Sequence, residues 1–165
     1  MTLCTASRQH VFFGIALIAL MGMGFALYAQ YQLNLEPCPL CIFQRVALIA
    51  TGGLALLCAL SARLPYVAKS FGGLTVLAST VGAGIAGWHV RLQHLPAEQV
   101  PACGPGLDYM IETMPFSKML GKVFHGSGEC AAIDWTLLGF SMPVWTLALF
   151  MGVTVLAVIG LRKTR

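Results

Sequence analysis

Two cysteines separated by two residues, Cys38 and Cys41, stand in the stretch EPCPLCIFQRVALIA at residues 36–50. A disulfide between them would close a very short loop and would therefore stabilise the fold less than a long-range disulfide. C-x-x-C pairs are more often redox or metal centres than structural links. An apolar run follows at once, with Arg45 in its first turns. The pattern indicates a dithiol that exchanges two electrons where water gives way to lipid.

Arg45 lies four residues after Cys41. In a helix that begins near Cys41, these two residues share one face and lie about 6 Å apart along the axis. The unpaired N–H groups and the dipole at the helix start, together with the guanidinium, favour the thiolate of Cys41, which is the reactive species. The guanidinium can also donate hydrogen bonds to an acceptor oxygen in the headgroup region. The alternative interpretation is that Arg45 only snorkels to the interface.

The elements that must position these residues are membrane helices. The chain of 165 residues is 58% hydrophobic and 10% charged, whereas soluble domains carry roughly a quarter of charged residues. Crossing a bilayer takes about 20 helical residues, and four apolar stretches are long enough: 11–30, 42–61, 66–88 and 143–161. We therefore expect one all-α membrane domain over residues 1–165, built as a bundle of four transmembrane helices.

Four spans place both chain ends, 1–10 and 162–165, on the same side of the membrane as the short loop 62–65. Apart from Arg45, the basic residues outside the other two loops are Arg8, Arg63, Lys69, Arg162, Lys163 and Arg165. The positive-inside rule makes their side cytoplasmic. Loops 31–41 and 89–142, which contain all six acidic residues, are then exported.

The long loop 89–142 contains a helical pattern. Apolar residues recur there at spacings of three and four, at Phe116, Met119, Leu120, Val123 and Phe124. Pro115 stands just before them, at a favourable first helical position. The pattern predicts a short amphipathic helix, which either lies on the membrane surface or packs against its own loop.

The six cysteines divide by compartment. Four of them lie in the exported loops, Cys38, Cys41, Cys103 and Cys130, and four cysteines allow three pairings. The adjacent pair closes most readily, which leaves Cys103 with Cys130. Structural zinc usually needs two C-x-x-C knuckles, but the second pair is 27 positions apart, so we expect no metal. Cys4 and Cys58 are expected to be ordinary free thiols.

A lipid-soluble electron acceptor meets a thiolate most easily at the membrane surface. A quinone offers two carbonyl oxygens and takes up two electrons, the number that a dithiol releases when it closes to a disulfide. Position, thiolate stabilisation and stoichiometry together make electron transfer from the thiols to a quinone plausible, without establishing it.

Four stretches carry a resemblance to a known family: EPCPLCIFQR, GWHVRLQH, FHGSGECA and WTLLGFSMPVW. C-x-x-C alone is not specific. Its combination with an arginine four residues on, a preceding span, a second exported loop with two cysteines and a four-span profile is specific. The sequence resembles the DsbB family of bacterial disulfide bond formation proteins over nearly the whole chain.

The resemblance implies a protein dithiol:quinone oxidoreductase of the bacterial inner membrane, with no nucleic acid as partner. It would reoxidise a DsbA-like periplasmic thiol oxidase and pass the electrons to ubiquinone or menaquinone; the DsbA–DsbB–quinone route is what keeps the periplasm oxidising. By the family pattern, Cys103 forms the mixed disulfide with the partner and Cys130 passes electrons to the Cys38–Cys41 pair. Cys41 then engages the quinone, assisted by Arg45.

Two further residues bear on the quinone site. His89, at the outer end of the third span, matches a histidine that some members carry near the quinone, where it could relay a proton. The alternative is an interfacial histidine hydrogen-bonded to backbone. Gln44 stands where some relatives carry an acidic residue, so the charge balance of this pocket differs from theirs.

Three other functions compete with this one. In the first, the exported disulfides are only structural. In the second, the chain carries reducing equivalents outward, which would need a cysteine pair on the inner side, and Cys4 with Cys58 is not a convincing one. The third is a vitamin K epoxide reductase-like enzyme, in which the C-x-x-C follows the loop cysteines, whereas it precedes them here.

Overall fold

The computed structural model describes residues 2–61, 63–96, 112–113, 115, 117–118, 121, 128–133 and 135–162, with side chains except at 2–7 and 128–129. Cys103 lies outside the described residues. So do Phe116, Met119, Leu120, Val123 and Phe124, which define the predicted amphipathic helix.

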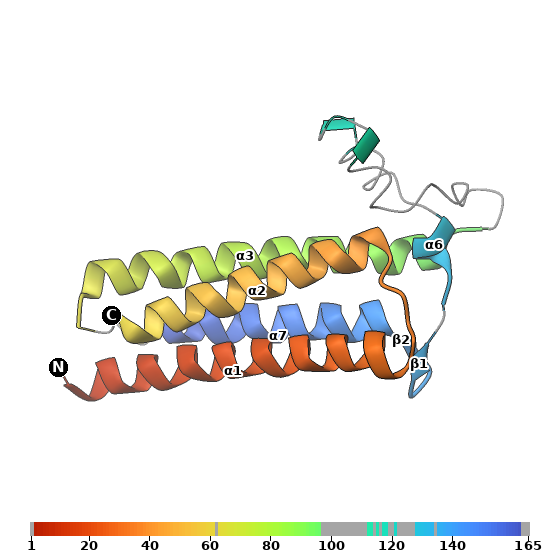
Figure 1. Cartoon of the computed structure of the whole chain (residues 1–165). Coiled ribbons are helices and arrows are strands. Elements are labelled where there is room, and N and C mark those ends of the chain that lie inside the picture. The colour runs from red at the N-terminus through yellow and green to blue at the C-terminus, as the bar shows by residue number, and fades with distance from the viewer. Residues whose placement is uncertain are drawn as a thin grey trace.

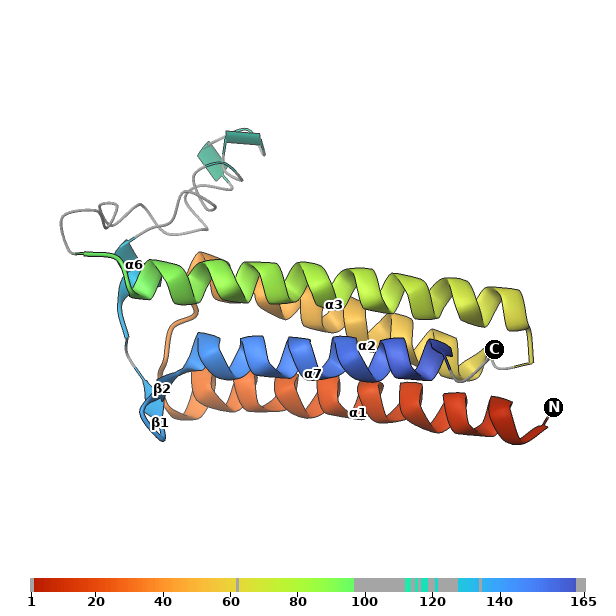
Figure 2. The same ribbon diagram turned by 180° about the vertical axis from the view of Figure 1, so that it is seen from behind.

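Four long helices form an antiparallel bundle (Figures 1 and 2). They are α1 (Thr2–Gln32), α2 (Pro39–Leu60), α3 (Pro65–Gln93) and α7 (Met142–Arg162). Each is long and apolar enough to cross a membrane. Both chain ends lie at one end of the bundle, and the short elements lie at the other (Figure 1). The all-α, four-span architecture predicted from the sequence is confirmed.

The helices extend beyond the apolar stretches from which the spans were predicted. Helix α2 begins at Pro39, with Cys38 as its extended N-cap, because proline suits the first helical position. Helix α3 likewise begins at Pro65 and continues to Gln93, past the predicted end of the span at 88. An apolar stretch marks the part of a helix that lies in lipid, whereas the backbone hydrogen bonds continue into the polar boundary.

Small residues let the helices approach one another. A side chain at Gly82 of α3 would overlap the ring of Phe150 on α7, and a Cβ at Gly52 of α2 would lie 2.8 Å from the Cβ of Ala19 on α1. The Thr154 hydroxyl donates to the Ser79 hydroxyl across the α3–α7 interface, at 2.8 Å. The outward faces carry large exposed apolar side chains, such as Leu20 and Leu77. This pattern is typical of helices that pack through small residues inside a lipid environment.

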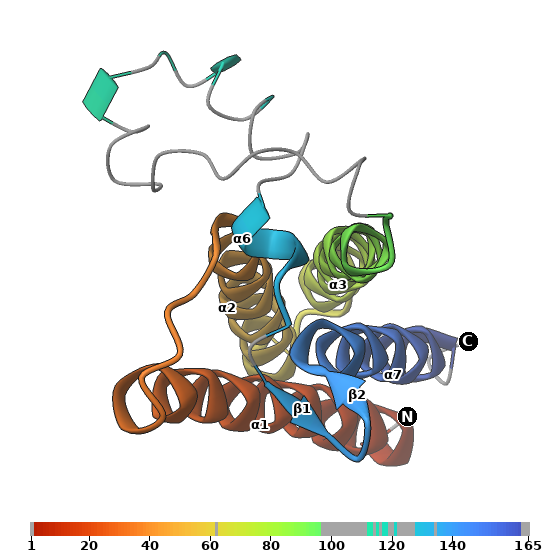
Figure 3. The same cartoon turned by 90° about the vertical axis from the view of Figure 1, so that its right-hand side faces the viewer.

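The end of the bundle away from the chain termini carries a one-turn helix, α6 (Gly128–Ala131), and a hairpin of β1 (Thr136–Leu137) and β2 (Phe140–Ser141). Viewed end-on, α6 lies over the ends of α2 and α3, and the hairpin lies beside α1 and α7 (Figure 3). Thr136 pairs with Ser141 and Leu137 with Phe140.

The hairpin was not predicted from the sequence. Its two turn residues, Leu138 and Gly139, both have positive φ, at 53° and 83°, as a type I′ turn requires. The Ser141 hydroxyl donates to Gln93 Oε1 on α3 at 2.6 Å, and the indole of Trp145 on α7 donates to the Leu137 carbonyl at 3.3 Å. The hairpin is therefore tied to two of the long helices.

Candidate redox site

The C-x-x-C motif lies at the start of α2. Cys38 is the N-cap and Cys41 is in the first turn, where the sequence placed it. The Cys38 thiol donates to Cys41 Sγ at 3.1 Å, and both side chains are half-buried thiols in this structure. Their separation is close enough for a disulfide to form with a small side-chain rotation. The Cys38–Cys41 disulfide remains a prediction.

Cys130 of α6 lies beside this motif. It is 1% exposed and belongs to an apolar cluster with Leu40 of α2 and Leu92 of α3. Its Sγ, the Sγ of Cys38 and a ring nitrogen of His89 all lie within 4.8 Å of one another. The packing of α6 over the ends of α2 and α3 therefore brings a loop cysteine to the first cysteine of the motif.

His89 connects the two cysteines through one ring nitrogen. Its Nε2 is 3.0 Å from the Cys130 carbonyl oxygen and 3.8 Å from Cys38 Sγ, and its Nδ1 is 3.0 Å from Gln44 Nε2. A carbonyl oxygen only accepts, so Nε2 carries the proton and Nδ1 accepts from the Gln44 amide. His89 and Gln44 are 2% and 5% exposed, and both ring nitrogens of His89 have a hydrogen-bond partner.

Cys38, His89 and Cys130 have side chains of the kinds that bind metal ions. Zinc held by two sulfurs and one nitrogen at about 2.0–2.3 Å would draw these atoms to roughly 3.5 Å from one another. They spread to 4.8 Å, and His89 Nε2 already points its proton at a carbonyl oxygen. The arrangement fits hydrogen bonding better than metal ligation.

Arg45 reaches from α2 to α1. Its guanidinium donates to the Gln30 side chain and, at 3.0 Å, to the Ala26 carbonyl. It is therefore held against the neighbouring helix near Cys41, and it does not simply extend along α2 toward the membrane surface. A guanidinium has five N–H donors, so these bonds leave donors for an acceptor that enters from the cavity described next.

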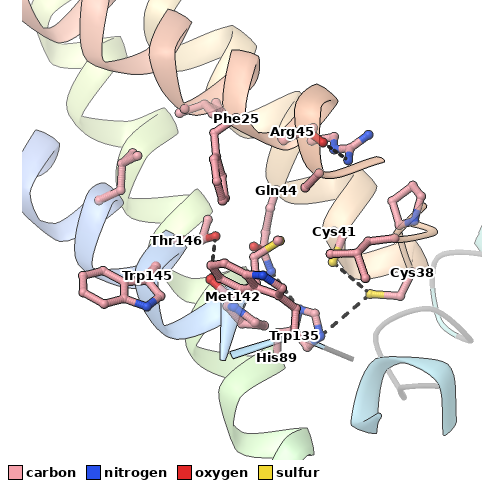
Figure 4. A pocket seen from close by; sticks show the side chains of 18 of the residues that line it. Phe25, Cys38, Cys41, Gln44, Arg45, His89, Trp135, Met142, Trp145 and Thr146 are labelled. Carbon is pink, nitrogen blue, oxygen red and sulfur yellow. Dashed lines mark hydrogen bonds between the residues drawn. The ribbon is translucent and has the colours of Figure 1, made fainter. Parts of the chain in front are cut away.

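A cavity of about 340 Å³ opens beside Cys41, within the size range of small-molecule sites. It is lined by side chains of all four long helices and, before and within the hairpin, by Ala132, Trp135 and Leu137. The aromatic rings of Phe25 and Trp135 are in contact in a tilted arrangement, with 5.8 Å between centroids and 58° between their planes. Figure 4 shows them beside Thr146, Gln44 and the two cysteines of the motif. The lining is mostly apolar and aromatic, with a few polar side chains from α2, α3 and α7.

The structure brings Cys38, Cys41, Arg45 and His89 to this cavity, with Cys130 directly behind Cys38. Cys103, the remaining predicted site residue, lies outside the described residues. Sequence reasoning missed Phe25 and Gln30. Phe25 lies within the predicted span 11–30 and Gln30 is its last residue, and no pattern in the sequence distinguishes either of them. Trp135 begins the WTLLGFSMPVW stretch, so its place in a motif was a usable signal.

The profile of the family described as "Disulfide bond formation protein DsbB" matches residues 8–160. A "Disulfide bond formation protein B" from Acinetobacter baumannii is 52% identical over 83% of this chain and 81% of its own length. Proteins of the same name from Chromobacterium violaceum and Nitrosococcus oceani are 49% and 46% identical over 95% of this chain, and over 96% and 92% of their own lengths. With this coverage and identity, the chain belongs to the DsbB family of disulfide bond formation proteins.

Proposed function

We propose that this protein takes electrons from a periplasmic dithiol oxidase of the DsbA type and passes them to membrane quinone. As a DsbB family member it is a multi-pass membrane oxidoreductase that forms disulfides. The observation that carries the finer proposal is the position of Cys41 and Arg45 on the wall of one aromatic cavity, with Cys130 behind Cys38.

The proposed relay begins at Cys103, whose disulfide with Cys130 is attacked by a thiolate of the reduced partner. A partner–Cys103 bond forms, the Cys103–Cys130 bond breaks, and the electron pair leaves on Cys130. Thiol–disulfide exchange needs a thiolate within reach of a disulfide sulfur. Cys130 Sγ, within 4.8 Å of Cys38 Sγ, meets this requirement.

Cys130 then attacks Cys38 of the Cys38–Cys41 disulfide. A Cys38–Cys130 bond forms, the Cys38–Cys41 bond breaks, and the electron pair leaves on Cys41, on the cavity wall. Cys103, released when the partner closes its own disulfide, returns to Cys130 and frees Cys38. Cys38 can then close on Cys41 again, which gives up two electrons.

The cavity suits a quinone ring as the acceptor of those electrons. Phe25 and Trp135 offer flat apolar surfaces for the ring, and Arg45 has N–H donors for a carbonyl oxygen. A bound quinone would supply a two-electron, two-proton acceptor that leaves through the lipid as a quinol. Ubiquinone and menaquinone both have the required ring and carbonyl groups.

The same proposal fixes the orientation in the membrane. Both chain ends lie at the end of the bundle away from the cysteine site (Figure 1), and basic residues gather near those ends. By the positive-inside rule the termini are cytoplasmic and the cysteine site is periplasmic, in the bacterial inner membrane.

Quinone reduction by the purified protein, supplied with a reduced DsbA-type oxidase, tests the proposal. Wild type should reduce quinone in a thiol-dependent reaction, and Cys41→Ser should abolish it. Cys58→Ser removes a cysteine buried in the apolar core and serves as the matched control, with turnover kept. A folded wild-type protein that reduces neither ubiquinone nor menaquinone would leave the cysteines with a structural role alone.

A further inference from the structure

His89 and Gln44 form a hydrogen-bonded pair that the relay as described does not use. Both are almost fully buried, and they lie on different helices, α3 and α2. A buried polar side chain is costly unless its hydrogen-bonding groups are satisfied. Here the imidazole contacts the Gln44 amide through Nδ1. Through Nε2 it contacts the Cys130 carbonyl and the Cys38 sulfur, which belong to the two cysteines that exchange.

The proton of His89 is aimed at the pair of residues that must exchange. Because Nε2 donates to the Cys130 carbonyl at 3.0 Å, it fixes the backbone of Cys130 against α3. The same N–H lies 3.8 Å from Cys38 Sγ, within reach of a shared hydrogen bond to sulfur. The Nε2–H group of His89 therefore holds the backbone of Cys130, the nucleophile, and also faces Cys38 Sγ, the sulfur that Cys130 attacks.

Gln44 fixes which ring nitrogen carries that proton. A neutral imidazole has one donor and one acceptor nitrogen, and the Gln44 amide, 3.0 Å from Nδ1, acts as a donor to it. Without this amide, the buried Nδ1 would lose its partner, and the ring would be free to rotate or to change tautomer. Gln44 is thus a positioning residue that acts through His89.

The geometry points to His89, positioned by Gln44, as the group that stabilises Cys38 when it leaves the Cys38–Cys130 disulfide. This inference rests on the proposed relay. In that step the Cys103 thiolate attacks Cys130, the Cys103–Cys130 bond forms and the Cys38–Cys130 bond breaks. The electron pair leaves on Cys38, and the Nε2–H of His89 donates to the resulting thiolate. The proton stays on His89, so the step balances without a further reactant.

This assignment differs from a role at the quinone. His89 does line the cavity, but within the motif its ring nitrogen contacts the sulfur of Cys38, whereas Cys41 is the motif cysteine beside Arg45. Loss of a hydrogen bond to a leaving thiolate should slow the release of Cys38. It should not weaken quinone binding. The Cys38–Cys130 disulfide should then accumulate during turnover.

Acid quenching during steady-state turnover, alkylation of thiols and peptide mapping by mass spectrometry would measure that disulfide directly. Gln44→Met has a similar length and no amide donor. We expect kcat to fall about tenfold, as for a lost hydrogen bond to a charged group, with a severalfold rise in the Cys38–Cys130 fraction and a quinone KM within about twofold of wild type. His89→Phe should show the same effects more strongly.

Gln44→Glu is the conservative rescue, because its carboxylate can accept from Nδ1–H while Nε2–H still faces Cys38. It should keep the Cys38–Cys130 fraction low, which a loss of packing alone would not explain. A raised quinone KM in Gln44→Met or His89→Phe, with no accumulation of the Cys38–Cys130 disulfide, would overturn the inference and place His89 at the quinone. Thiol-dependent turnover in wild type separates this outcome from failure of the relay itself, which would remove the inference with it.

Discussion

Cys58 and Cys130 are each about 1% exposed, yet they lie toward opposite ends of the bundle among different neighbours. Cys58 packs with Phe12 and Val153, and its thiol donates to the Ala68 carbonyl at 3.1 Å. Cys130 lies beside the imidazole of His89 and the sulfur of Cys38. Burial is the same for both, so the difference in expected chemistry comes from neighbours that can exchange with or stabilise a thiolate.

Replacing each of these two buried cysteines tests the comparison most severely. Cys130→Ser should lower thiol-dependent quinone reduction at least about a hundredfold, because the nucleophile of the exchange is lost. Cys58→Ser should keep turnover within about twofold, since its sulfur donates to a backbone carbonyl in the apolar core. Steady-state assays on both variants measure this, and equal losses would show that burial, and not the neighbours, decides the outcome.

Cys103→Ser should abolish the covalent intermediate with the partner. In the proposed relay the partner attacks the sulfur of Cys103, and serine cannot form a disulfide. Trapping with a partner variant that lacks its resolving cysteine, followed by non-reducing electrophoresis, would detect the intermediate. Its formation at normal yield through another cysteine would contradict the assigned role.

Arg45→His should raise the quinone KM about tenfold while the protein remains folded. The expected size is that of one hydrogen bond from a charged donor. Arg45 also binds α1 through Gln30 and Ala26, so Gln30→Leu is the matched control that removes a side-chain link and keeps the guanidinium. An unchanged quinone KM in Arg45→His would refute the role of Arg45 at the quinone.

The smallest effect is expected away from the cysteines, in helix packing. Gly82→Ala places a Cβ against the ring of Phe150, and overpacking of this kind costs about 1–3 kcal/mol. Gly84→Ala, with no heavy atom within 4 Å of its Cβ, should leave stability nearly unchanged. Thermal unfolding in detergent would compare the two. Equal unfolding midpoints in the two variants would show that α3 and α7 can move apart at this contact without loss of stability.

The four-helix bundle and the start of α2 could be predicted because they depend on local signals. Apolar length marks the spans, and Pro39 with the adjacent cysteines marks a helix start. The position of Cys130 could not be predicted, since it depends on how α6 packs over α2 and α3. The Gln44–His89 bond joins two helices, and no spacing along the chain encodes it.

The contrast between local signals and contacts between helices also explains which residues around the cavity could be predicted. Arg45 stands out in an apolar stretch because a charge there is rare, whereas its acceptor Gln30 lies at the end of a helix, where polar residues are ordinary. The hairpin at 136–141 depends on a turn whose leucine adopts positive φ, which is unusual for that residue type. Sequence rules therefore find the reactive groups more easily than the groups that hold them.

Electron transfer from the partner dithiol through these cysteines to quinone can be measured in an anaerobic single turnover, in which the disulfide formed on the partner and the quinol formed are counted together. We expect one quinol for each partner disulfide in wild type and none in Cys41→Ser. Partner oxidation without quinol, or quinol formation that persists in Cys41→Ser, would disprove this route.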